Sequence, residues 1–112
     1  MSSGDLFDAF KSQVISNAGA LAKDTLKDFI TLAEDDAKAF LISSEEKLER
    51  WTGMLAEKQL TKLEFSALVD SQKGLAVLNS LAHAGIAAAA LQRFRDSLIE
   101  IVLDAAFATF LP

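Results

Sequence analysis

Apolar residues recur at intervals of three and four along most of the chain, and no stretch keeps a strict alternation of apolar and polar residues. The first spacing places side chains on one face of an α-helix, whereas alternation is typical of a strand. The pattern therefore predicts an all-α protein. We expect an antiparallel, up-and-down bundle of four helices, possibly five, that forms a single domain over residues 1–112.

The longest apolar stripe occupies the first third of the chain. Its phase is kept through the small and polar residues 16–19, which favours one long helix from about Asp5 to Leu41. Two helices that meet near Gly19 are the alternative, and would raise the helix count to five. The stripe consists of Phe7, Phe10, Val14, Ala18, Leu21, Ala22, Leu26, Phe29, Ile30, Ala33, Ala37, Phe40 and Leu41.

The stretch from Ile42 to Glu46, in which four polar residues follow the isoleucine, predicts the first break. Ser43 and Glu46 have the spacing of a capping box, in which a hydroxyl accepts from an amide three residues on and the carboxylate there bonds back. We expect a short helix to follow, ending near Lys58. Its inward positions are Leu48, Trp51 and Leu55.

A second capping box, Thr61 with Glu64, predicts a helix that starts at Lys62. Leu60 and Phe65 flank the box with the spacing of a hydrophobic staple, an independent sign of the same start. This helix should continue to about His83. Gly85 then closes it, because glycine readily adopts the left-handed backbone that ends helices. The alternative is a helix that continues through Gly85, since residues 87–90 are strongly helix-forming.

The last helix, predicted from about Ile86 to Phe110, is apolar around most of its circumference. One stripe consists of Ile86, Ala90, Phe94, Leu98, Ile101, Val102 and Ala105. A second consists of Ile99, Leu103, Phe107 and Phe110. A narrow acidic ridge, Asp96, Glu100 and Asp104, accompanies them.

The composition agrees with helices and restricts the location. Alanine and leucine supply 36 residues, against 10 for valine and isoleucine. The first pair favours helices and the second favours strands. The chain has no cysteine, which excludes disulfides and thiolate metal sites and is consistent with a reducing compartment, so we expect a cytoplasmic protein.

The charge distribution argues against two classes of partner. A net charge of −5 would repel the phosphates of a nucleic acid. The uncharged stretch 74–92 is mostly alanine and contains polar residues, whereas a membrane-spanning helix needs about 20 strongly apolar residues. We expect neither nucleic-acid binding nor stable membrane insertion.

Candidate catalytic and metal-binding residues are few. His83, the only histidine, lies where a helix should end and is expected to bond the last carbonyls. Ser44 and Lys47 match Ser-x-x-Lys, but the partner motifs of that chemistry are missing. The acidic ridge is interpreted as a solvated face. We expect no catalytic site, metal or cofactor.

The second stripe of the last helix is the feature that suggests a function. A helix that is apolar all round is either central or covered by something outside the chain. We expect a non-catalytic interaction protein that forms a homo-oligomer or docks a protein partner through Ile99, Leu103, Phe107 and Phe110. The alternative is a carrier of an apolar ligand or a reversible binder of lipid surfaces, although the acidic ridge disfavours anionic membranes.

Overall fold

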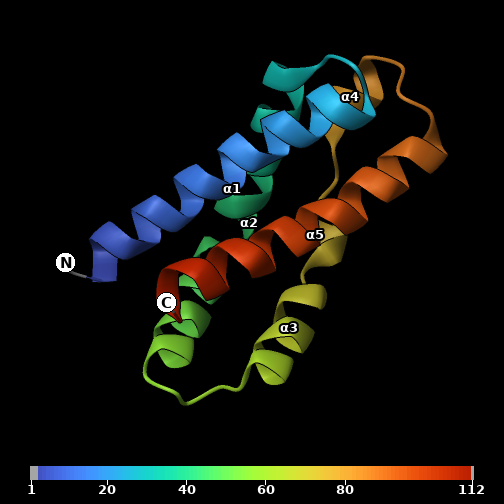
Figure 1. The fold of residues 1–112 in the computed structure, drawn as a ribbon. Coiled ribbons are helices and arrows are strands. Elements are labelled where there is room, and N and C mark those ends of the chain that lie inside the picture. The colour runs from blue at the N-terminus through green and yellow to red at the C-terminus, as the bar shows by residue number, and fades with distance from the viewer. Residues whose placement is uncertain (1–2, 112) are drawn as a thin grey trace.

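Three long helices run along the molecule, with α1 antiparallel to α2 and α5 (Figure 1). The computed structural model describes residues 3–111. Between α2 and α5 the chain returns through three short segments: α3, the 3-10 turn η1 and α4. The described residues form helices and turns without strands, which confirms the all-α, up-and-down bundle. The bounds are α1 Ser3–Thr25, α2 Ile30–Ala56, α3 Lys62–Asp70, η1 Lys73–Leu75, α4 Asn79–His83 and α5 Ala88–Phe110.

The first reversal of the chain lies at residues 26–29, so the prediction of one helix reaching Leu41 was wrong. α1 does run unbroken through Gly19. Lys27 and Phe29 turn the chain with φ angles of 65° and 66°. Leu26 and Phe29 pack against the core from within this turn. Because the turn supplies apolar side chains at the helical spacing, the stripe passes through the reversal without a change of phase.

The predicted break between Ile42 and Glu46 was also wrong, because α2 continues through it. Phe40, Ser44 and Leu48 follow one another at intervals of four residues and are all buried. An N-cap contributes about 1 kcal/mol, whereas each large apolar side chain buried by the continuous helix contributes about 1.5–3 kcal/mol. Packing of the apolar face therefore outweighs the local signal at Ser43.

The start of α3 is the local signal that the structure confirms most directly. The Glu64 amide donates to Thr61 Oγ1 at 3.1 Å, and the Thr61 amide donates to Glu64 Oε1 at 2.9 Å. The hydrogen bond from the Thr61 backbone lowers the pKa of the Glu64 carboxyl. The predicted helix ends at Asp70 instead of near His83, and its remaining length is divided between η1 and α4.

α4 begins without a cap of its own, and a residue of α2 supplies one. Leu78, at its N-terminus, is buried with a positive φ of 58° and has no polar side chain. The carboxylate of Asp36, itself only 5% exposed, accepts hydrogen bonds from the amides of Ser80 and Leu81, both at 2.9 Å. These amides are among the helix donors that have no partner within the helix. Asp36 is thus a cap donated by another helix.

The linker between α3 and α4, residues 71–78 including η1, is held against α5. Arg95 Nε donates to the Ala76 carbonyl at 2.7 Å, and Lys73 forms an ion pair with Asp96. Each side chain of that ion pair stabilises the charged form of the other, so the pKa of Asp96 is lowered and that of Lys73 is raised.

The end of α4 follows the prediction at Gly85. Gly85 has φ 90°, and its amide donates to the Ala82 carbonyl at 3.1 Å. The next amide, of Ile86, donates to the Leu81 carbonyl, which completes a closure of the type that glycine favours. α5 then begins at Ala88, two residues later than expected.

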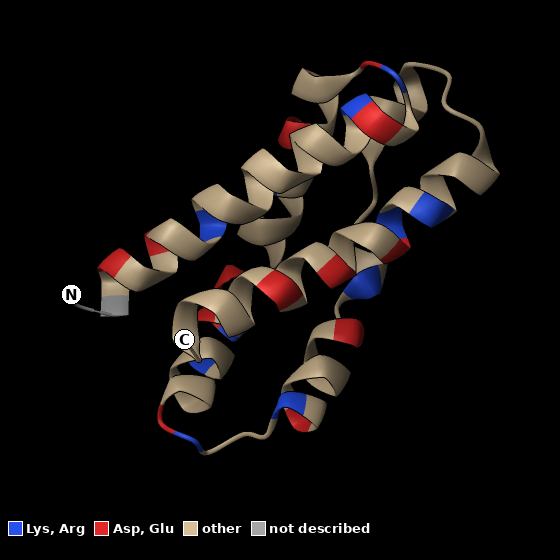
Figure 2. Cartoon of the chain, in the orientation of Figure 1, with Lys and Arg blue, Asp and Glu red and all other residues tan. Residues whose placement is uncertain are grey.

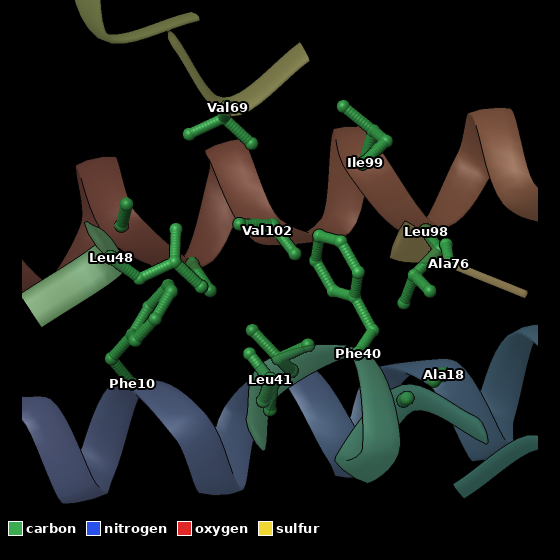
Figure 3. Close-up of a cluster of buried hydrophobic side chains, with 14 of the residues drawn as sticks. Phe10, Ala18, Phe40, Leu41, Leu48, Val69, Ala76, Leu98, Ile99 and Val102 are labelled. Carbon is green, nitrogen blue, oxygen red and sulfur yellow. The ribbon is translucent and has the colours of Figure 1, made fainter. Parts of the chain in front are cut away.

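One continuous core joins the three long helices to the short elements α3, η1 and α4. Phe10 from α1, Leu48 from α2 and Val102 from α5 converge in its middle (Figure 3). Val69 of α3 lies on the other side of α5. α5 is therefore packed against neighbours on more than one side.

Replacing Asp36 with alanine should destabilise the fold by about 2–3 kcal/mol, because the buried amide of Leu81 and the partly buried amide of Ser80 lose their acceptor. Urea unfolding of the purified protein measures this change. Asp35→Ala, at an exposed neighbouring position, is the control and should change the free energy of unfolding by less than about 0.5 kcal/mol. Equal effects of the two substitutions would contradict the role of Asp36 as a cap.

Replacing Gly53 with alanine should stabilise the protein by about 0.5–1 kcal/mol, because Gly53 lies within α2 and a Cβ there meets no atom within 4 Å. Gly85→Ala should instead destabilise it by about 1 kcal/mol, since its φ is positive. Thermal unfolding of the two variants gives the signs. A lower melting temperature for Gly53→Ala would show that space at this position is not free.

Candidate functional site

The predicted partner-binding stripe of α5 lies largely inside the molecule. Ile99 and Phe110 are only 4% and 8% exposed, and Leu103 and Phe107 are half-buried. Ile99 lies on the side of α5 that also carries Val69 of α3 (Figure 3). The expectation that all four residues form an outer face is therefore wrong for Ile99 and Phe110.

Aromatic contacts from α1 and α3 account for the covering. The ring of Phe110 meets that of Phe10 edge to face, with centroids 6.0 Å apart. The ring of Phe107 packs against that of Phe65 at 5.9 Å, and Lys62 Nζ lies 5.2 Å from the Phe107 centroid. α3 therefore covers this side of α5, where a partner was expected to bind.

One large apolar side chain remains exposed in the middle of α2. Ile42 is 64% exposed and borders a groove of about 270 Å³ between α1 and α2. The half-buried Ile15 and the buried Leu41 also line this groove. The groove is lined by Asp8, Lys11, Ser12, Ile15, Lys38, Leu41, Ile42 and Glu45.

A second, smaller hollow lies on the other side of the same turns of α2. It has a volume of about 130 Å³ and receives Ala39 and Ser43 from α2, together with Leu75 and Val77 from the linker. Leu75 and Val77 are themselves exposed. Ala39 and Ser43 lie on the opposite flank of α2 from Leu41, so the second hollow faces another side of the helix, and Ile42 lines only the first.

The two ends of the α1–α2 groove carry different charges. At one end, Lys11 Nζ contacts Glu45 Oε1 at 2.8 Å and Asp8 Oδ1 at 3.6 Å. The hydrogen bond to Glu45 is the largest cause of a raised pKa of Lys11. This end holds two carboxylates and one ammonium group. At the other end, Lys38 forms no hydrogen bond or ion pair with any residue in the described range.

Sequence reasoning missed this groove because it placed Ile42 in a break between helices. The available signal was the phase of Ile42, which lies opposite Phe40 and the buried face when α2 is continuous. An apolar residue on an outer helix face was therefore visible in the sequence, but only for a helix that runs through residues 42–46.

The remaining candidate residues lie at a helix end or in buried positions. His83 Nδ1 lies 2.8 Å from the Asn79 carbonyl, as expected for a histidine at a helix end. Ser44 is buried, and its hydroxyl has no hydrogen-bond partner among the described residues. Trp51 is buried in the core. Within residues 3–111, no group of three histidine, aspartate or glutamate side chains is arranged to hold a metal ion.

Acidic and basic residues are spread over the helices, and on α5 the basic residues lie near its start while acidic residues follow (Figure 2). No helix in the described part of the chain has a stretch long and apolar enough to cross a bilayer. Comparison with protein-family models, curated proteins and solved structures finds no match to this chain.

Replacing Phe107 with aspartate should destabilise the monomer by about 2 kcal/mol, since a half-buried ring in contact with Phe65 is lost. Ile42→Asp should leave stability within about 0.5 kcal/mol, because its side chain is mostly exposed. Urea unfolding of both variants measures the contrast. A fully stable Phe107→Asp protein with a changed oligomeric state would instead restore α5 as the docking surface.

Proposed function

We propose that this chain is a non-catalytic helical interaction protein that docks a protein partner over the middle of α2. The observation that carries the proposal is Ile42, an apolar side chain that is 64% exposed in mid-helix and borders the groove between α1 and α2. Single exposed apolar residues are common on protein surfaces. Ile42 differs because the half-buried Ile15 lines the same groove and extends the apolar surface on the α1 side.

The shape of this surface favours a protein partner over a small apolar ligand. Pockets for small molecules usually have about 300–1,000 Å³ and enclose most of the ligand. The α1–α2 groove has about 270 Å³, which one or two side chains of a partner would fill. Ile42 in turn projects outward and can enter a pocket on the partner.

The surrounding charges also support a protein partner. Lys38, Lys11 and Glu45 border the apolar centre, as polar residues border the centre of many protein interfaces. With a net charge of −5 and basic residues spread over the helices, nucleic acid remains a poor fit. We also propose a cytoplasmic location, which the absence of cysteine favours.

The test compares Ile42→Glu with Leu63→Glu in the cells that make this protein. Leu63 is 81% exposed on α3 and lines neither hollow, so it is a matched control. Burying an isoleucine contributes about 1.5–3 kcal/mol, so Ile42→Glu should reduce partner recovery at least about tenfold. Quantitative mass spectrometry of proteins that co-purify with each tagged variant, including an untagged copy of this chain, gives the recovery.

The expected result is a protein recovered equally with the wild type and Leu63→Glu but lost with Ile42→Glu. Thermal melts of the purified variants establish that both are folded. If no co-purifying protein, including the untagged copy, depends on Ile42, the proposed function is wrong.

A further inference from the structure

We propose that the protein docked over α2 is a second copy of this chain, related to the first by a two-fold axis beside Ile42. This inference rests on the proposed function and names its partner. In a two-fold dimer the same surface of both protomers meets itself, so the surface must be complementary to its own rotated image. The α1–α2 groove meets this condition in its charges and in its apolar centre.

The charges of the groove are placed on opposite sides of Ile42. Lys38 lies four residues before it on α2, and Glu45 lies three residues after it. Seven residues separate Lys38 from Glu45, which is about 10 Å along a helix. Asp8 of α1 lies near Glu45, since both contact Lys11. The groove therefore has a basic end and an end with two carboxylates.

A two-fold rotation about an axis beside Ile42 exchanges these ends. Lys38 of one protomer then faces Glu45 of the other, and the reverse contact forms at the opposite end. Glu45 can accept a second bond, because Lys11 occupies Oε1 and no residue in the described range bonds to Oε2. A groove with the same charge at both ends would repel its own copy.

The apolar centre of the groove is also self-complementary. Ile42 projects from each protomer, and the groove beside it is lined by the half-buried Ile15 and the buried Leu41. Each Ile42 can therefore pack beside the groove of the other protomer.

Charges outside the groove limit this dimer to the α1 side of α2. Asp35 and Glu46 lie on the outer side of Ile42, where a rotated copy would bring like charges together. Each protomer also has a net charge of −5, which opposes association over longer distances. We therefore expect a weak, reversible dimer.

A charge exchange between positions 38 and 45 tests the inference on the purified full chain. Lys38→Glu places two carboxylates at each contact, and Glu45→Lys places two ammonium groups there. When the two variants are mixed, both contacts of the mixed dimer are again between opposite charges. The double variant Lys38→Glu/Glu45→Lys likewise restores both contacts in a dimer with itself.

Sedimentation velocity over a range of protein concentrations at low ionic strength measures the association. The wild type should show a concentration-dependent dimer, and each single variant should weaken it about tenfold. The mixture and the double variant should recover the wild-type behaviour. Lys47→Glu, an equal charge change at an exposed position of α2 outside the groove, is the control and should weaken the dimer much less than Lys38→Glu does.

A wild type that stays monomeric at every concentration overturns the inference, as does a pair of variants that fails to recover when mixed. Neither result removes the proposed function, since an Ile42-dependent partner of another sequence would still be recovered from cells. Loss of Ile42 dependence for every protein, this chain included, overturns both.

Discussion

The hydrogen bonds between Asp36 and the start of α4 are the constraint on which the arrangement of the chain between α2 and α5 depends. Asp36 lies in α2, 44 residues before Ser80, and its buried carboxylate accepts two amides of a five-residue helix. Such a short helix is not stable by itself. The bonds hold α4 against α2, and they keep the buried Leu78 in a left-handed conformation that a leucine adopts at some cost.

The break between α3 and α4 decides how α5 is covered. A straight helix from residue 62 to 83 would follow one line along the bundle, whereas α3 and α4 contact α5 separately. Phe65 of α3 then packs on Phe107, while Arg95 of α5 holds the linker carbonyl at Ala76. The apolar side chains of α5 are thus packed within the chain, whereas Ile42 of α2 remains exposed.

The middle of α2 is consequently the surface on which the proposed interaction rests. α2 packs on α1 and α5 through one face and on α4 through its flank, while its outer face carries Ile42. The neighbouring groove has an ion-paired end at Lys11, and at its other end lies Lys38, which has no ion-pair partner among residues 3–111. An apolar centre with unlike charged ends is a surface that can bind its own copy.

The sequence by itself determined the helical class, the start of α3 at Thr61 and the closure at Gly85, because these depend on contacts between residues a few positions apart. The tertiary structure decided the reversal at residues 26–29, the continuity of α2 through Ser43 and the end of α3 at Asp70. It also decided that Phe110 meets Phe10, a residue 100 positions away. Those outcomes depend on which distant groups pack together, and the spacing of apolar residues along the chain is the same whether a turn or a helix carries them.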